Sequence, residues 1–229
     1  MRKFTLIHFF ILLGNFGVPG SAIVLAFLFP QQKWRWFFLT FILFHSFERI
    51  WETFFTSHER KVHEFHVDWP LAFVTASYIC LCFVVIFEFF LFNKTPKIAV
   101  LLMGCIVYLS AFRLRWWGMK SLGSQWSIHA VGAIKLKRFK LLKIGAYKYM
   151  RHPVYLGIML EEIGMPLMWN AFVALAFSVL ICLPLVVIRA VMEERSSLRK
   201  FGSSFLAYKQ EVDMFLPLKI VQRTLTPWQ

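Results

Sequence analysis

Long runs of apolar residues, separated by short polar segments, dominate the hydrophobic pattern of this chain. The runs extend over residues 4–29, 36–56, 69–92, 97–117, 154–168 and 171–191. A helix needs about 20 mainly apolar residues to cross a hydrocarbon core of about 30 Å. The stretches 4–29, 69–92 and 172–188 are almost free of charge and approach or exceed that length. The pattern predicts an all-α integral membrane protein with about six transmembrane helices.

The last two runs predict a helical hairpin, because only Trp169 and Asn170 separate them. A hairpin returns both of its ends to the same face of the membrane. The preceding segment 118–152 has no apolar run that could span, and a connection of about 35 residues is typical of a functional loop. We therefore expect a cytoplasmic cofactor-binding segment there. The expected division is 1–117 with about four spans, then 118–229 with segment 118–152, hairpin 153–192 and an amphipathic helix 193–213.

Composition supports the membrane assignment, and the distribution of charge orients the chain. Hydrophobic residues make up 59% of the sequence, with 27 Phe and 9 Trp, whereas soluble domains are nearer half apolar. Six crossings place both termini, loop 57–68 and segment 118–152 on one side. That side carries Arg2, Lys3, Arg60, Lys61, Lys120, Lys135, Lys137, Arg138, Lys140, Lys143, Lys148, Arg151, Arg195, Arg199, Lys200, Lys209, Lys219 and Arg223. The opposite side carries only Lys33, Arg35, Lys94 and Lys97.

The positive-inside rule therefore predicts that both termini and segment 118–152 are cytoplasmic. Topology and attraction to anionic lipid explain the net charge of +14, so the expected partner is the lipid bilayer and not a nucleic acid. The membrane would be the inner or plasma membrane of a bacterium, or the endoplasmic reticulum of a eukaryote. The sequence does not determine the oligomeric state.

A first polar cluster stands where the hairpin begins. It runs from Tyr147 through Arg151 and His152 to Tyr155, with Pro153 at the position that suits the first residue of a helix. Proline disfavours helical geometry in the residue before it, so His152 should end an extended stretch beside a helix N-terminus.

A second polar cluster stands where the hairpin ends. Arg189 and Glu193 are four residues apart and share one helix face, whereas Glu194 is turned about 100° away. Charged groups at membrane depth are costly and tend to be functional. From the residues alone, a functional pocket and a set of interfacial anchors beside a solvated helix explain both clusters equally well.

Four motifs occur in a fixed order in the C-terminal half. They are Leu122-Gly123-x-x-Trp126, Arg151-His152-Pro153-Val154-Tyr155-Leu-Gly157, Arg189-x-x-x-Glu193-Glu194 and Phe201-Gly202-x-x-Phe205-x-x-Tyr208. This set resembles the isoprenylcysteine carboxyl methyltransferase family, which includes related membrane methyltransferases that act on phospholipids and small thiols. The resemblance covers about Arg113 to Pro217, and the N-terminal spans resemble nothing specific.

The resemblance implies methyl transfer from S-adenosylmethionine, bound between segment 118–152 and the hairpin. It implies that Arg189 orients a substrate carboxylate and that Glu193 holds the cofactor. The other positions implied for cofactor contact are Phe139, Lys140, Leu141, Leu142, Tyr147, His152, Pro153, Val154 and Tyr155. The stretch 139–142 is more basic than in the family. The pair Glu161-Glu162 departs from the enzyme that methylates prenylated proteins, which suggests another substrate or a second polar patch.

This chemistry needs no metal. In-line transfer from a sulfonium requires alignment of the reacting atoms, and a carboxylate acceptor is already ionised at neutral pH. An arginine can hold the carboxylate through two hydrogen bonds, and aromatic faces can surround the sulfonium. We expect a lipophilic acceptor, such as an isoprenylcysteine-like carboxylate. Alternatives of the same fold are a phospholipid amine or a small thiol, and both gain weight if the source is bacterial. Alternatives of another class are a membrane reductase-like or non-catalytic relative and a transporter.

Two further polar features are interpreted as structural. The loop 57–68 is rich in His, Glu and Asp but lacks a recognised ligand spacing, so no metal site is expected there. Glu48 and Glu52 share a face of the second span, which must look into the bundle or toward the interface. The favoured interpretation is a helix end that reaches into the headgroup region.

Overall fold

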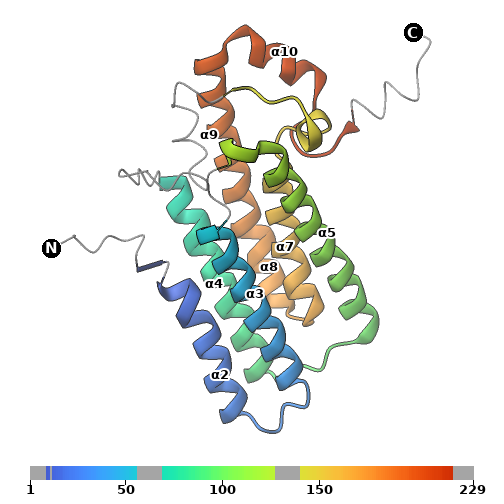
Figure 1. Ribbon diagram of the computed structural model, residues 1–229. Coiled ribbons are helices and arrows are strands. Elements are labelled where there is room, and N and C mark those ends of the chain that lie inside the picture. Colours follow the sequence, from blue (N-terminus) through green and yellow to red (C-terminus); the bar gives the residue numbers. More distant parts are fainter. Residues whose placement is uncertain (1–8, 11, 56–68, 127–139, 219–229) are drawn as a thin grey trace, which may run out of the picture.

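The described part of the chain is a bundle of helices that run side by side (Figure 1). The computed structural model describes residues 9–10, 12–55, 69–126 and 140–218. Within these ranges the chain is helical apart from turns, connections and one isolated β-bridge between Met150 and Asp213. The predicted all-helical class is therefore confirmed for the described residues.

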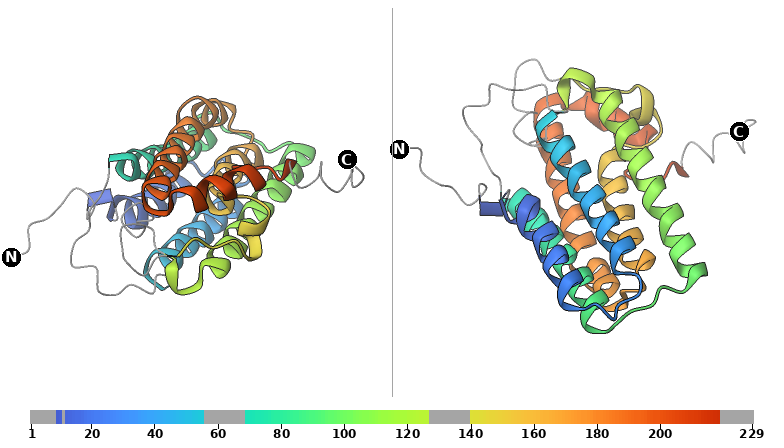
Figure 2. Two further views of the ribbon diagram at one scale, coloured as in Figure 1. Left: turned by 90° about the horizontal axis from the view of Figure 1, so that it is seen from above. Right: turned by 60° about the horizontal axis from the view of Figure 1, so that its bottom comes forward.

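The helices follow the apolar runs of the sequence, and two turns of π-helix interrupt them. In chain order the helical elements are η1 (Leu13–Gly17), α2 (Val18–Leu28), α3 (Arg35–Phe55), α4 (Trp69–Leu91), α5 (Ile98–Leu122), η2 (Gly123–Gln125), η3 (Gly145–Lys148), α7 (Pro153–Met168), α8 (Phe172–Phe177), η4 (Ser178–Cys182), α9 (Leu183–Phe201) and α10 (Ser203–Glu211). α5 packs along α7, and α10 lies across the end of the bundle at which α7 begins (Figure 2).

Three helical stretches within the described residues are long and apolar enough to cross a membrane. They are Trp69–Leu91, Ile98–Gln125 and Phe172–Phe201, and they identify a membrane protein. α7 has only 16 residues, fewer than the roughly 20 that a crossing needs, and α3 carries Glu48, Arg49 and Glu52. The prediction of about six crossings therefore goes beyond these stretches and stays a prediction.

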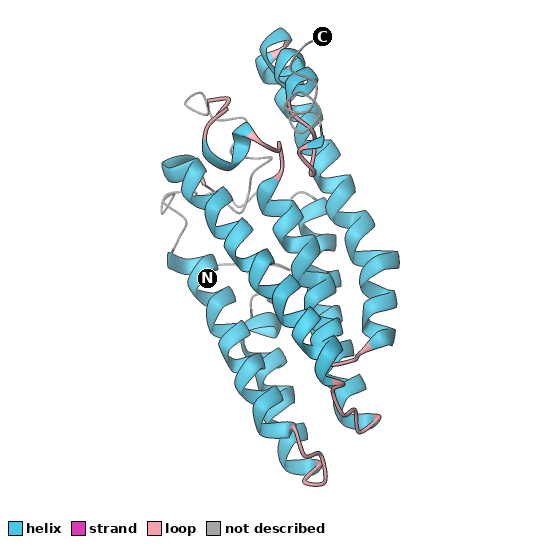
Figure 3. Cartoon of the chain, turned by 90° about the vertical axis from the view of Figure 1, so that its right-hand side faces the viewer, coloured by secondary structure: helices cyan, strands magenta, loops and turns pink. Residues whose placement is uncertain are grey.

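The predicted hairpin is present, with α7 on one side and α8, η4 and α9 on the other (Figure 1). Figure 3 shows the described residues as helices joined by loops and turns. Asn170 makes the turn in the left-handed region (φ 54°), which asparagine tolerates better than most residues. The Glu88 carboxylate of α4 accepts hydrogen bonds from the backbone amides of Ala174 (2.9 Å) and Val173 (3.3 Å). An acidic group at a helix N-terminus is favourable, so Glu88 ties the start of α8 to α4.

The helices do not end at the expected internal boundaries. α5 continues to Leu122, so the boundary expected between residues 117 and 118 lies inside it. α9 continues to Phe201 and stops at Gly202, which has a positive φ of 53°. The boundary expected after residue 192 therefore lies inside α9, because the first residue that favours a helix end is Gly202.

Small residues allow the backbones of α5 and α7 to touch. A Cβ atom on Gly104 would lie 2.3 Å from the backbone nitrogen of Met168, and one on Gly164 would lie 2.8 Å from that of Tyr108. Close helix contact through glycine is common in membrane proteins. Since α7 carries the first polar cluster, this contact also sets how α7 is held in the bundle.

Gly104→Ala is expected to destabilise the protein by about 1–3 kcal/mol, because a methyl group there meets backbone atoms that cannot rotate away. The matched control is Gly20→Ala in α2, where an added Cβ meets no atom of the described residues within 4 Å and improves helix propensity by up to about 1 kcal/mol. Thermal unfolding in detergent compares the two variants. Equal unfolding midpoints would contradict the close packing of α5 on α7.

Candidate functional site

The entry to α7 is held against the C-terminal part of the chain. His152 has a non-helical backbone (φ −130°, ψ 60°), and Pro153 is the first helical residue, as the sequence predicts. The backbone amides of Arg151 and His152 donate to the carbonyl oxygens of Asp213 (2.9 Å) and Met214 (3.0 Å). The residues that follow α10 therefore lie beside those that lead into α7.

The two predicted polar clusters meet at the hydroxyl group of Tyr155. This hydroxyl accepts a hydrogen bond from Nε of Arg189 (2.9 Å) and lies beside the Glu193 carboxylate. The Arg189 side chain is 3% exposed, and its guanidinium carbon lies 5.9 Å from the centre of the Tyr155 ring. The His152 ring stacks on Tyr155 with centroids 5.4 Å apart. The hairpin therefore brings together a cation, a carboxylate and two aromatic rings.

Tyr147 and Tyr208 link this junction to α10. The hydroxyl of Tyr208 donates to the carbonyl oxygen of Tyr147 over 2.6 Å. Burial, with a further contribution from the nearby Glu193 carboxylate, raises the pKa of Tyr147 well above its ordinary value. Burial also raises the pKa of Tyr208. Both hydroxyl groups therefore keep their protons at neutral pH, and that of Tyr208 donates the hydrogen bond to Tyr147.

Pro153 and Val154 face α5. A Cβ atom on Gly118 would lie 2.8 Å from Cγ2 of Val154 and 3.2 Å from Cγ of Pro153. Val154 also belongs to an apolar cluster with Met119 and Trp126. The side chains of these two predicted positions therefore pack against α5.

The predicted stretch 139–142 lies partly outside the described residues, which exclude Phe139. Lys140 is exposed, and Leu142 is partly buried. Leu141 packs against an apolar cluster that includes Phe205 and Tyr208 of α10. Leu141 therefore lies against α10, whose Tyr208 is hydrogen-bonded to Tyr147.

Glu194 forms a buried ion-pair group that the sequence interpretation missed. Its carboxylate lies 2.7 Å from Nη2 of Arg151 and 2.9 Å from Nζ of Lys209, and 3.4 Å from Nε2 of His152. Arg151 also donates to the carbonyl oxygen of Val212. The signal in the sequence was the position of Glu194 beside Glu193, but only the fold shows which basic residues it pairs with.

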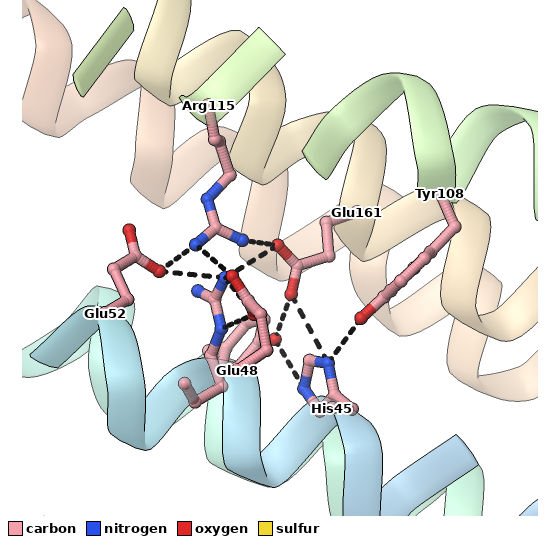
Figure 4. Close-up of polar contacts among 8 residues, drawn as sticks. His45, Glu48, Glu52, Tyr108, Arg115 and Glu161 are labelled. Atoms are coloured by element: carbon pink, nitrogen blue, oxygen red, sulfur yellow. Dashed lines mark hydrogen bonds and ion pairs between the residues drawn. The ribbon is translucent and has the colours of Figure 1, made fainter. Parts of the chain in front are cut away.

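A third polar cluster, which we call the interior cluster, lies inside the bundle between α3, α4, α5 and α7 (Figure 4). Arg115 of α5 donates to Glu161 of α7 and to Glu48 and Glu52 of α3. The side chains of Arg115 and Glu161 are each 2% exposed. The favoured interpretation of Glu48 and Glu52 as a helix end among headgroups is therefore wrong, because both side chains face the interior and bind a buried arginine.

Histidine and tyrosine side chains complete this interior cluster. The ring nitrogens of His45 lie 2.7 Å from the hydroxyl of Tyr108 and 2.8 Å from that of Tyr78, and Tyr78 donates to Glu161. Arg49 pairs with Glu48 (2.7 Å), Glu52 (2.9 Å) and Glu161 (3.3 Å). The cluster is thus a continuous hydrogen-bonded network of buried groups.

The donor atoms of His45, Glu48 and Glu161 lie within 4.8 Å of one another, close enough to hold a metal ion. Both carboxylates, however, are already bound by guanidinium groups of Arg49 and Arg115. A metal ion would have to displace these cations or share the carboxylates with them. We therefore interpret the interior cluster as an ion-pair network.

Comparison with known proteins adds an independent line of evidence. Residues 99–199 match the model of the isoprenylcysteine carboxyl methyltransferase (ICMT) family. The chain is 27% identical to the protein-S-isoprenylcysteine O-methyltransferase of Saccharomyces cerevisiae over 201 residues, which cover 83% of each protein. It is also 27% identical to the uncharacterized protein YpbQ of Bacillus subtilis over 124 residues, which are 54% of this chain and 71% of YpbQ. The family resemblance predicted from the sequence is therefore confirmed.

Proposed function

We propose that this chain, which carries the isoprenylcysteine carboxyl methyltransferase pattern over residues 99–199, transfers a methyl group from S-adenosylmethionine to a lipophilic acceptor at a membrane. The observation that carries the proposal is the meeting of Tyr155, Arg189 and Glu193 on the two arms of the hairpin. All three residues lie within the matched range. The printed name of the yeast relative, an isoprenylcysteine O-methyltransferase, supports the same reaction class.

The groups at the junction fit the chemistry of the cofactor, which when bound supplies a methyl group activated on a sulfonium. The partly buried Glu193 carboxylate can accept hydrogen bonds from an ammonium group or from ribose hydroxyls. The rings of His152 and Tyr155 can present their faces to a cation. The remaining proposed contacts are Phe139, Lys140, Leu141, Leu142, Tyr147, Pro153 and Val154.

Arg189 is the residue that we assign to the acceptor. Its guanidinium is buried and oriented by the hydroxyl of Tyr155, and an arginine can hold a carboxylate through two parallel hydrogen bonds. A carboxylate acceptor is ionised at neutral pH and has no proton to lose. The task of the protein is then to align the acceptor oxygen with the methyl group, which suits an isoprenylcysteine-like carboxylate.

The proposed topology has about six spans, with both termini and segment 118–152 on the cytoplasmic side, and residues 118–229 as the methyltransferase half. Basic residues support it, because the end of the bundle at which α7 begins carries the exposed Lys120, Lys143, Lys148, Arg195 and Lys209. A water-soluble cofactor would arrive from that side, and the bilayer would supply the lipophilic acceptor.

The test is titration calorimetry of the detergent-purified protein with S-adenosylmethionine and S-adenosylhomocysteine. We expect both to bind at one site per chain. Adenosine triphosphate is the control, since it shares the adenosine but lacks the sulfur-linked amino acid, and it should give no comparable heat. A protein that binds neither sulfur-containing ligand would refute the methyltransferase assignment.

A further inference from the structure

The interior cluster connects the N-terminal helices to the helix that begins at the proposed site. Arg115 of α5 binds Glu48 and Glu52 of α3 and Glu161 of α7. Arg49 of α3 pairs with the same three carboxylates, but of these two arginines Arg115 is the one that brings α5 into this contact between α3 and α7. Glu161 lies six residues beyond Tyr155 on α7, about 9 Å farther along the helix axis. The position of α7 is therefore coupled to α3 through a group that touches neither cofactor nor acceptor in the proposed function.

The path of the Arg115 side chain depends on Gly157. A Cβ atom on Gly157 would lie 2.3 Å from Cγ and 3.2 Å from Cδ of Arg115. The arginine stem thus crosses the surface of α7 where a side chain is absent, between the turn that carries Tyr155 and the turn that carries Glu161. Glycine at position 157 is therefore explained by the space that the Arg115 side chain needs, without any contact with a ligand.

Breaking this network would be costly, because its ion pairs are almost completely buried. Removing one partner of a buried ion pair leaves a buried charge without compensation, which strongly destabilises a protein. The two Nη atoms of Arg115 are both hydrogen-bonded to carboxylates, and such buried networks hold their members rigidly. α7 is therefore held against α5 at two positions along its length. One is the backbone contact at Gly104 of α5 and Gly164 of α7, and the other is the ion pair of Arg115 with Glu161, which lies nearer the proposed site.

We propose that Arg115 is a positioning residue of the methyltransferase site, which holds α7 in the register that presents His152 and Tyr155 to the cofactor. The inference rests on the proposed function. It also assigns a role to the N-terminal half, since Glu48 and Glu52 of α3 keep the Arg115 guanidinium directed at Glu161. The N-terminal helices are then part of the working unit and more than a membrane anchor.

The deciding variant is Arg115→Lys, which keeps the positive charge but replaces a planar group with several donors by a point charge. Calorimetric titration with S-adenosylhomocysteine separates two quantities, the number of competent sites per chain and the dissociation constant at those sites. A positioning role predicts an unchanged site number and a dissociation constant raised about tenfold. A role in stability alone would lower the site number and leave the dissociation constant unchanged, which would overturn the proposal.

A second variant and a matched control complete the test. Gly157→Ala should displace the Arg115 stem and also crowd the carbonyl oxygen of Ala111 in α5, which would lie 3.0 Å from the added Cβ atom. It should raise the dissociation constant in the same way, without altering any charge. Glu162→Gln is the control, because Glu162 is the neighbour of Glu161, is 0% exposed and makes no hydrogen bond to any residue that the structure describes. It should bind S-adenosylhomocysteine as the wild type does. If the wild type itself bound no S-adenosylhomocysteine, the proposed function would fail. If the wild type bound it and the Arg115 and Gly157 variants bound it equally tightly, the positioning role would fail and the proposed function would stand.

Discussion

Arg189→Ala is expected to reduce methyl transfer at least about 100-fold while the protein still binds S-adenosylmethionine, because misalignment of the acceptor by about 1 Å is enough for such a loss. Glu193→Ala is expected to abolish cofactor binding. Both residues lie on one face of α9, one helical turn apart and next to the hydroxyl of Tyr155. Comparing the two variants therefore tests whether Arg189 binds the acceptor while the neighbouring Glu193 binds the cofactor.

Two measurements on each variant distinguish the role of Arg189 from that of Glu193. Calorimetry with S-adenosylmethionine reports binding, and transfer of a labelled methyl group to N-acetyl-S-farnesylcysteine reports turnover. Arg189→Lys is the control for charge, and it should recover only part of the turnover because lysine lacks the planar fork. If Arg189→Ala and Glu193→Ala both bound the cofactor like the wild type, the assignment of Glu193 would be wrong.

Glu194→Ala is expected to destabilise the protein by about 3–5 kcal/mol, since it leaves the buried Arg151 without its carboxylate. For a chain of this length, that loss corresponds to a fall of about 10 °C in the midpoint of thermal unfolding. The same change removes the partner of Lys209 and loosens the attachment of α10. Cofactor binding should weaken as well, because α10 is hydrogen-bonded to Tyr147.

Thermal unfolding measures the loss of stability. Limited proteolysis in the residues that follow α10 measures how firmly α10 is attached. The matched control is Glu211→Ala, which removes an exposed ion pair with Lys143 of 3.9 Å and should cost at most about 1 kcal/mol. The double variant Arg151→Met with Glu194→Leu should recover part of the lost stability, because well-packed apolar residues can replace a buried ion pair. A Glu194→Ala protein as stable as Glu211→Ala would show that the buried pair has no such role.

Features that depend on residues near each other in the chain were predictable. The all-helical class followed from the apolar runs, and the hairpin followed from the two residues that interrupt the last two runs. The start of α7 at Pro153 followed from the geometry of proline itself. The meeting of Tyr155 with Arg189 could also be anticipated, because a hairpin returns its ends to one face.

Features that depend on distant residues could not be predicted in this way. Glu194 follows Glu193 directly, and nothing local distinguishes a solvated carboxylate from one that binds Arg151, 43 residues away. Arg115 precedes Trp116 and Trp117, and nothing in this local sequence marks it as buried, yet the fold buries it against Glu161, 46 residues away.

The sequence by itself therefore determined the membrane class, the helices, the hairpin and the family resemblance, because hydrophobic length, proline geometry and motif order are local properties. Only the tertiary structure decided which charges are buried in pairs and which glycine, Gly157, leaves space for the buried Arg115 side chain. The physical reason is that a buried charge requires a partner. The packing of α3, α5, α7, α9 and α10 determines which residue lies close enough to be that partner.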